Sequence, residues 1–527
     1  MKKIKYNKIS AAVVLLGLFT ATSCVNDLEQ TPITDVTSAS VYKDFNNYKN
    51  VLAKVYGGFA NGGQDAGGGN ADINGIDGNF SQYTRQLFTM QNLPTDEAVI
   101  AWNDGTLQTI HKMTWDSQNE FIAAMYYRIY TEIAFCNEFL RNTTDAKLAE
   151  NNITGSNLTE AKYMRAEARY LRALSYYHAL DLFGNVPFPL EDYLPGSATP
   201  PARITRANLF TFVESELKAV EGEMKDAKTN EYARADKAAA WSLLARLYLN
   251  AQVYTGTQRY TDCITYCNKV IAAGYTLKSS YGGLFLADNH LNNPELIFPI
   301  AFDGQKIQTY GGTTYMVHAA VGGSMPASQF GINGGWGGIR TTKAFVNLFT
   351  GNSSDQRGNF YTSGQNLEIN DLGTFTDGYG YIKYKNVTSA GVAGSDSAGN
   401  FVDADQPVFR LADIYLMYAE ATLRGGSGGT TTQALSYVNA LRTRAGASTV
   451  SSISTDFILD ERGRELAWEF TRRTDLIRYG KFTTASYLWP WKGGVKDGKA
   501  VEDFRNLYPI PAKDIIQNPN LIQNPGY

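Results

Sequence analysis

Apolar residues recur every three to four positions through much of this chain. Over residues 161–183 this spacing describes one face of an amphipathic helix, and Gly184, Asn185 and Pro187 follow where such a helix would end. The chain is therefore predicted to be mainly α-helical. The same spacing predicts further helices over 206–225, 235–252, 259–273, 408–424, 431–445 and 457–479.

Two pairs of these predicted helices also show the pattern of small and bulky residues that is typical of tetratricopeptide repeats. In such repeats the two helices of each unit pack closely on one another. We expect a tetratricopeptide-like helical-repeat scaffold that supports a loop-rich ligand-binding subdomain. The matching positions are Trp241, Leu244, Ala245 and Tyr248 with Cys263, Cys267 and Val270, and Tyr415, Tyr418 and Ala419 with Ala434, Val438 and Leu441.

A different composition interrupts the helices between residues 280 and 405. Gly, Thr, Tyr and Asn are frequent there, and only short β-like runs occur, at 296–302 and 379–384. We expect the stretch 280–405 to be a loop-rich binding insertion. It would divide an N-terminal helical region at 41–279 from a C-terminal helical region at 406–527.

The N-terminus has the pattern of a lipoprotein signal peptide. Several lysines precede an apolar run at 9–19, which is too short to cross a bilayer but has the length of a signal-peptide core. Small residues then lead to Cys24, so we predict a signal peptide at 1–23, lipidation of Cys24 and a tether over 24–40. An ordinary signal peptide with an incidental cysteine is the alternative. No other stretch is apolar enough for a membrane helix, so the lipid would be the only anchor.

Charge and metal-ligand content exclude several functions. The chain has 48 basic and 51 acidic residues, so no net positive field would gather nucleic acid. Its 4 histidines are far apart in the sequence and form no zinc-protease motif. Cys263 and Cys267 lie one helical turn apart with no histidine nearby, which favours core packing over a zinc site.

Motifs that would indicate an enzyme are weak. Residues 425–429 match the G-x-S-x-G pattern of hydrolases, but they join two predicted helices, so we interpret them as a flexible turn. Asp96 and Glu97 are a carboxylate pair, but neighbouring residues seldom converge on one bond, and a capping role is favoured. We expect no catalysis. A surface glycoside hydrolase with carboxylates from distant segments stays an open alternative.

Aromatic rings in unusual settings are the strongest indication of a binding function. Aromatic residues make up 13% of the chain, and Trp102, Tyr310 and Trp336 lie in polar or glycine-rich sequence that is unlike a core. A large ring in such a setting usually marks an interaction surface. Sugars pack their apolar faces on such rings, while a few polar groups bond their hydroxyls. For any one of these rings, packing in the core or in a turn is the alternative.

Several sequence runs together resemble the SusD-like (RagB/SusD) family of outer-membrane nutrient-binding lipoproteins. A second set of runs is most similar to the starch-binding member of that family. The resemblance implies a helical-repeat scaffold, nutrient binding and no catalysis. The first set is LPTDE at 93–97, AEARYLRA at 166–173, LFGNVP at 182–187, RRTDLIRYGK at 472–481, YPIP at 508–511, NPN at 518–520 and NPGY at 524–527, and the second is RADKA at 234–238, ARLYLNA at 245–251, YGGTTY at 310–315 and WPWKGG at 489–494.

The resemblance also implies which residues bind the ligand. In the starch-binding member an arc of three aromatic rings cradles a curved α-1,4-glucan. The matching positions in this chain are Trp102, Tyr310 and Trp336, the same rings that their sequence settings single out. The polar contacts of that member fall on Asp77 and Arg85.

One position departs from the pattern of the starch-binding member. Gly105 stands where that member has a sugar-contacting asparagine, so Asn103 or Asp104 would have to replace the contact, and Asn103 is our candidate. The family also implies a structural calcium in a region that contains Asp288, without assignable ligands. No other cofactor is expected.

A location and a partner follow from the same resemblance. The acidic run at 26–29 resembles the export signal that sends such lipoproteins to the outer face of the outer membrane. We therefore expect a lipid-anchored protein on the cell exterior that captures starch or malto-oligosaccharides. It would pass them to a SusC-like TonB-dependent transporter. A SusD-like binder of another glycan or of a peptide is the alternative.

Overall fold

The long helices of the computed structural model follow the predicted apolar spacing. The structure describes residues 38–194 and 196–527. Helix α8, Gly155–Leu182, contains all but the last residue of the helix predicted over 161–183. It is followed by Gly184, whose φ of 76° permits the left-handed turn that closes a helix, and whose N–H donates to the carbonyl oxygen of Ala179. The chain is mainly helical, as predicted.

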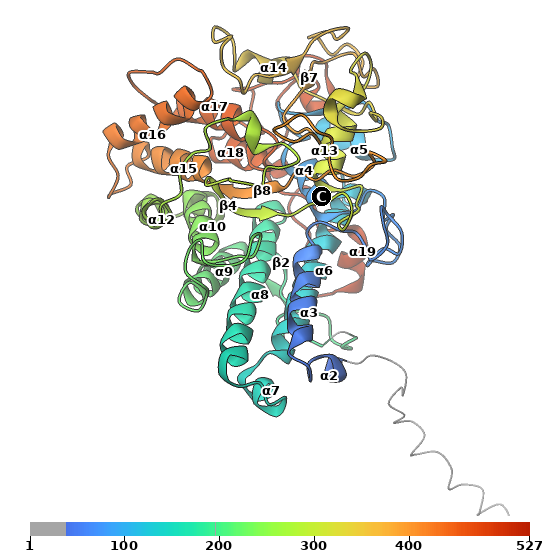
Figure 1. Ribbon diagram of the computed structural model, residues 1–527. Helices are drawn as coiled ribbons and strands as arrows, with labels where there is room; N and C mark the ends of the chain where they lie inside the picture. Colours follow the sequence, from blue (N-terminus) through green and yellow to red (C-terminus); the bar gives the residue numbers. More distant parts are fainter. Residues whose placement is uncertain (1–37, 195) are drawn as a thin grey trace, which may run out of the picture.

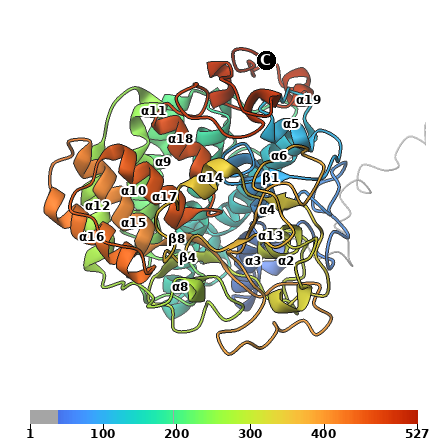
Figure 2. The same cartoon turned by 90° about the horizontal axis from the view of Figure 1, so that it is seen from above.

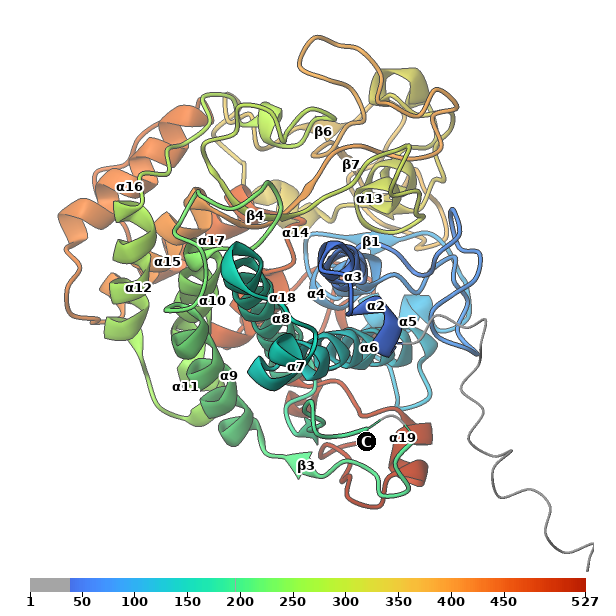
Figure 3. The ribbon, with the colours of Figure 1, turned by 60° about the horizontal axis from the view of Figure 1, so that its bottom comes forward.

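Neighbouring helices pack side by side to form the scaffold, as Figures 1 and 3 show. Helix α8 lies against α6 and α9. The two predicted repeat pairs are also in contact, because α10 packs on α12 and α15 packs on α16, and α12 contacts α15 as well. This arrangement agrees with a tetratricopeptide-like scaffold. The bounds are Glu120–Asn142 for α6, Arg206–Val220 for α9, Lys237–Leu249 for α10, Tyr260–Ala272 for α12, Leu411–Leu423 for α15 and Thr431–Arg444 for α16.

Short strands tie the loop-rich region to the scaffold. Strand β4, Leu296–Ile300, pairs antiparallel with β8, Gln406–Arg410, so the beginning and end of the region lie side by side. Strand β1, Val99–Ile100, pairs with β5, Ile339–Arg340, and joins the middle of the region to an N-terminal loop. Seen from above, α12 and α16 lie on one side of the molecule and α13 lies on the other (Figure 2).

The remaining elements are short. The other two strand pairs are both antiparallel. They are β2, Val186–Pro187, with β3, Arg203–Ile204, and β6, Phe360–Tyr361, with β7, Gly380–Tyr381; the other helices are α2, Ser38–Val41, α3, Asn46–Gly57, α4, Tyr83–Gln91, α5, Leu107–His111, α7, Asp145–Glu150, α11, Ala251–Thr255, α13, Gly312–Ala320, α14, Lys343–Asn347, and α19, Ala512–Gln517, with 3-10 turns at Gly282–Leu284, Ala327–Phe330, Lys492–Gly494 and Asp503–Asn506.

The single helix predicted over 457–479 is wrong, because the structure has two helices there. Helix α17, Thr455–Leu466, and helix α18, Arg472–Arg478, are separated by a turn in which Trp468 has a left-handed φ of 62°. The backbone N–H of Trp468 donates to Glu97 Oε2 at 3.0 Å, and its ring is buried in the core. Tertiary contacts with the N-terminal part of the chain thus outweigh the local helical pattern.

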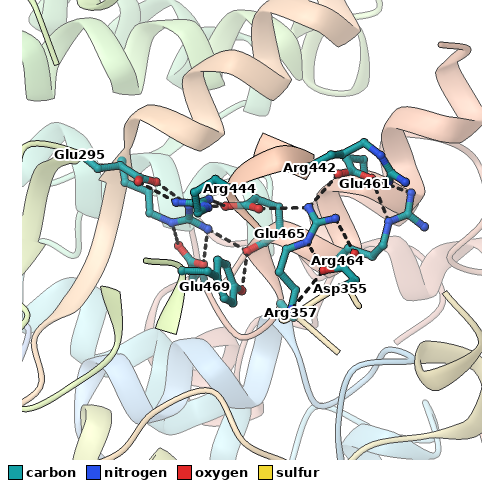
Figure 4. A network of polar contacts seen from close by, with 12 residues as sticks. Glu295, Asp355, Arg357, Arg442, Arg444, Glu461, Arg464, Glu465 and Glu469 are labelled. Atoms are coloured by element: carbon teal, nitrogen blue, oxygen red, sulfur yellow. Dashed lines mark hydrogen bonds and ion pairs between the residues drawn. The ribbon is translucent and has the colours of Figure 1, made fainter. Parts of the chain in front are cut away.

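A buried network of charged side chains joins the loop-rich region to α17 (Figure 4). Arg357 of the region bonds Glu461 and Glu465 of α17 at 2.7 and 3.1 Å, and all three side chains are fully buried. Burial alone would raise the pKa of Glu465, but the charges of Arg444 and Arg410 lower it overall. The network therefore fixes the region on the helical scaffold through paired charges.

Several predictions concern the N-terminus and the cysteines. The predicted signal peptide, the lipidation of Cys24 and the tether up to residue 37 lie outside the described residues, and residues 38–40 of that tether begin helix α2.

Cys263 and Cys267 are buried free thiols on α12, as expected for cysteines that pack in the core. Within residues 38–194 and 196–527, no helix combines the length and the hydrophobicity that crossing a bilayer requires.

Candidate functional site

A cleft of about 880 Å³ is lined by residues of α4, α5, α13 and the start of α6. Its walls come from segments that are far apart in the sequence, including the loop before α4, the loop after β1 and the loop before β5. Five of the six residues predicted to bind a glycan line this one cleft. They are Trp102, Tyr310, Trp336, Arg85 and Asp77.

The three predicted rings form one continuous wall of the cleft. The ring centres of Trp102 and Trp336 are 6.4 Å apart, and those of Tyr310 and Trp336 are 6.0 Å apart. Trp102 Nε1 donates to the carbonyl oxygen of Trp336 at 3.0 Å. The pairing of β1 with β5 brings these two tryptophans together, because Ala101 N–H donates to the carbonyl oxygen of Gly338 at 2.8 Å.

The glycines around the rings have a different role from the one expected. A β-carbon at Gly338 would lie 2.5 Å from Cε2 of Trp102, and a β-carbon at Gly67 would lie 2.7 Å from Cε2 of Tyr310. Trp102 and Trp336 are half-buried and pack against the hydrophobic core. The glycines therefore let backbone approach the rings closely and do not simply leave them exposed.

Arg85 and Asp77 are held beside the wall by local contacts. Arg85, on α4, donates through Nη1 to the carbonyl oxygens of Asn79 at 2.8 Å and Tyr310 at 3.2 Å. Its guanidinium lies 4.4 Å from the ring centre of Tyr315. Asp77 Oδ1 accepts from the backbone N–H and the side-chain amide of Asn79 at 2.8 and 3.0 Å. A cation and a carboxylate are thus available beside the rings.

Asp104, and not Asn103, lines the cleft next to Gly105. Asn103 is exposed but lies outside the cleft lining, so its contact with a ligand stays a prediction. Gly105 has a left-handed φ of 46°, and a β-carbon there would overlap Oε1 of Glu120. Glu120, the first residue of α6, therefore takes up the space beside Gly105 and lines the cleft itself.

Further lining residues were not found from the sequence. Leu107, Phe80 and Phe121 add an apolar patch, in which the two phenylalanine ring centres are 4.8 Å apart. His318 stacks on Trp336, and Asn333 and Asn400 are nearby polar residues of the lining. Their places depend on tertiary packing, so no local pattern could have identified them. The other lining residues found only in the structure are Asn79 and Glu120.

The sequence is similar to known proteins over its whole length. A family model described as the SusD family matches residues 352–527, and one described as starch-binding and associating with the outer membrane matches residues 36–249. The starch-binding protein SusD of Bacteroides thetaiotaomicron is 34% identical to this chain, and the match covers 100% of both chains. The chain belongs to the SusD family.

Solved structures of SusD relatives share this fold. The surface glycan-binding protein A of Bacteroides fluxus has a TM-score of 0.70 at 20% identity, over 92% of this chain and 99% of its own. A laminarin-binding SusD-like protein has a TM-score of 0.66 at 20% identity, over 92% of this chain and 99% of its own. The predicted resemblance to the SusD-like family is confirmed. As a member of that family of binding proteins, the protein is not an enzyme.

The carboxylate pair Asp96 and Glu97 is buried and structural in this SusD-family protein. Asp96 bonds Arg472 at 2.8 Å, and Glu97 accepts from the backbone of Trp468 and the side chain of Asn92. Burial raises the pKa of Glu97 to about 8. Hydrogen bonds and an ion pair from these two carboxylates therefore hold the C-terminal helices against the N-terminal part of the chain. The capping role that we predicted for the pair is wrong.

The carboxylate of Asp288, in the region for which calcium is predicted, accepts hydrogen bonds from Ser389. In the part of the chain that the structure describes, no three His, Cys, Asp or Glu side chains gather so that they could hold a metal ion. Both the backbone N–H and the hydroxyl of Ser389 donate to the Asp288 carboxylate, at 2.9 and 2.6 Å. Calcium in this region stays a prediction of the family resemblance.

Proposed function

We propose that this SusD-family protein binds starch or malto-oligosaccharides at the cell surface and passes them to a SusC-like TonB-dependent transporter. The observation that carries the proposal is the wall of Trp102, Tyr310 and Trp336, which three separate segments bring to one cleft beside Arg85 and Asp77. The 34% identity to the starch-binding protein SusD supports an α-1,4-glucan as the ligand. The helical scaffold would supply the extended surface that docks the transporter.

The chemistry of the wall suits a bent sugar chain. The apolar face of a sugar ring packs on an aromatic ring, while its hydroxyls need polar partners at the edge. The ring planes of Trp102 and Trp336 are inclined by 41°, and those of Tyr310 and Trp336 by 74°, so the wall changes direction. An α-1,4-glucan can follow this change, whereas a straight β-1,4 chain would meet only one or two rings. Release to a transporter requires weak binding, with dissociation constants of about 1 μM to 1 mM.

Isothermal titration with maltoheptaose and with cellohexaose tests the proposed ligand. We expect maltoheptaose to bind with a dissociation constant in that range. Cellohexaose should bind at least about tenfold more weakly, because it loses at least one ring contact. Equal affinities for the two chains, or a preference for cellohexaose, would contradict the proposal.

Another glycan or a peptide is the alternative ligand. One solved structure of similar fold is described as laminarin-binding, and a fold alone does not fix the ligand. A glycan array distinguishes starch from other glycans as the ligand. We expect α-1,4-linked glucans to give the strongest signals, and a stronger signal from a β-linked glucan would replace starch as the ligand.

We also propose that the protein is anchored by a lipid on Cys24 and faces the cell exterior. The signal-peptide pattern, the acidic residues Asp27 and Glu29 and the outer-membrane association of a matching family model support this location. Cys24→Ser should release the protein from the membrane fraction, because the lipid would be its only anchor. Replacing Asp27 and Glu29 by alanine should leave the protein lipidated but protected from proteinase added to intact cells. Digestion of this double variant as fast as the parent would contradict the export role.

A further inference from the structure

Three carboxylates line the cleft beside the aromatic wall. They belong to Asp77, Asp104 and Glu120, and all three residues are exposed, so a ligand in the cleft can reach them. Among residues 38–194 and 196–527, no ion pair joins any of these carboxylates to a basic side chain. Their negative charge is therefore not neutralised by a direct partner.

Glu120 is held where the loop after Trp102 turns toward α5. Its Oε1 accepts from the backbone N–H of Thr106 at 3.2 Å, and its own backbone N–H donates to Thr106 Oγ1 at 3.3 Å. Gly105 leaves room for this carboxylate, because a β-carbon there would overlap the same oxygen. A carboxylate has acceptor capacity for several hydrogen bonds, so Glu120 can also accept from ligand hydroxyls.

Arg85 and His318 are the basic residues of the described cleft lining. Arg85 is already bonded to two backbone carbonyl oxygens, and its guanidinium lies 4.4 Å from the ring centre of Tyr315. Burial lowers the pKa of Arg85, whereas the charges of Asp104 and Asp77 act in the opposite direction. Burial also lowers the pKa of His318 below its usual value, so this ring is uncharged at pH 7. Three carboxylates thus face one cation.

We propose that this acidic lining, made of Asp77, Asp104 and Glu120, makes the cleft select uncharged glycans over glycans that carry carboxylate or sulfate groups. An uncharged sugar offers hydroxyls, which carboxylates accept. A uronate or sulfate group brings a like charge beside three carboxylates and has only Arg85 as a counterion. This inference deepens the proposed function and rests on it, since it requires a glycan in the cleft.

Two derivatives of maltoheptaose with opposite charges test the acidic lining. In one, every C6 hydroxymethyl group is oxidised to a carboxylate, and in the other, every C6 hydroxyl is replaced by an amine. Both lose the C6 hydroxyls, so this loss cancels when they are compared. At pH 7 and about 10 mM salt, we expect the carboxylate derivative to bind the parent at least about tenfold more weakly than the amine derivative. Equal affinities, or a preference for the carboxylate derivative, would overturn the inference.

Salt should reduce this discrimination. At about 1 M salt the screening length falls from about 30 Å to about 3 Å, so the ratio of the two affinities should shrink to within about threefold. A ratio that is unchanged by salt would show that shape and not charge separates the two derivatives, and would overturn the inference.

Matched variants separate the acidic lining from the net charge of the protein. Glu120→Gln removes one carboxylate from the lining and should lower the low-salt affinity ratio about threefold. Asp104→Asn should do the same and gives a second, independent variant. Glu150→Gln is the control, because Glu150 is exposed on α7, outside the cleft lining, and the change in net charge is identical. An equal change of the ratio in the control and in the lining variants would overturn the inference.

Unmodified maltoheptaose separates this inference from the proposed function. If the parent binds maltoheptaose but does not distinguish the two charged derivatives, only the role of the acidic lining falls. If the parent binds none of the three ligands, both fall.

Discussion

At the scale of single residues, Gly338 shows how a missing side chain positions the binding wall. A β-carbon there would lie 2.5 Å from one atom of the Trp102 ring and 2.6 Å from another. Gly334, in the same glycine-rich loop, has no such neighbour, because no heavy atom lies within 4 Å of the place that a β-carbon would take there. The two glycines therefore look alike in the sequence but differ in what they do.

We expect Gly338→Ala to weaken maltoheptaose binding about tenfold. The added methyl group must push Trp102 out of the wall, and a lost ring contact costs about that much. Gly334→Ala is the matched control and should bind like the parent. Neither glycine has a left-handed φ, so neither substitution strains the backbone. Titration of both variants with maltoheptaose tests this prediction. An unchanged affinity of Gly338→Ala would show that the contact between Gly338 and Trp102 does not position the ring.

The sequence could reveal the rings but not their polar partners. Trp102, Tyr310 and Trp336 stand in unusual local settings, which is a signal that a single sequence carries. His318 and Glu120 have no such signal, because α13 and α6 bring them to the cleft only when the chain is folded. Residues that depend on tertiary packing cannot be identified from a local pattern.

At the scale of elements, the long helices could be predicted, and so could the β-like runs at 296–302 and 379–384, where β4 and β7 lie, whereas strands β1 and β5 could not. Helix α8 contains several turns of periodic apolar residues, which is why its position could be predicted. Strands β1 and β5 have two residues each, too few for any period, yet their pairing sets Trp102 beside Trp336. The break between α17 and α18 could not be predicted either, because it depends on a contact between distant residues. The backbone N–H of Trp468 in the turn donates to Glu97, which is far away in the sequence.

The buried charge network is the element-scale feature with the largest expected effect on stability. Arg410 of β8 bonds Glu295, Glu465 and Glu469, all nearly or fully buried. Arg410→Met should lower the free energy of unfolding by about 3–5 kcal/mol, because it removes one cation from three buried carboxylates. These carboxylates would then have only Arg357, Arg444 and Lys383 as partners. Lys147→Met, which removes an exposed ion pair, is the control and should cost about 0.5 kcal/mol or less. Urea denaturation measures both, and similar small losses would show that the network does not fix the loop-rich region.

At the scale of the whole molecule, the chain combines a helical-repeat scaffold with one aromatic cleft built largely from its loops. The scaffold followed from apolar periodicity, and membership of the SusD family followed from sequence runs spread along the chain. The shape of the cleft could not be predicted, because loops before α4, after β1 and before β5 meet there only in the folded chain. Binding, unlike the scaffold, thus depends on contacts between segments that are distant in sequence.

Titration of ring variants with maltoheptaose tests the central claim most directly. Tyr310→Ala and Trp336→Ala should each weaken binding about ten- to thirtyfold, because each removes about 60–80 Å² of apolar contact at about 25 cal/mol per Å². Tyr232→Ala is the control, since Tyr232 is 49% exposed and lies outside the cleft lining. Melting curves of all three proteins should show that they remain folded. The account predicts a loss of affinity in the two cleft variants alone, and folded cleft variants that bind maltoheptaose as tightly as the parent would contradict it.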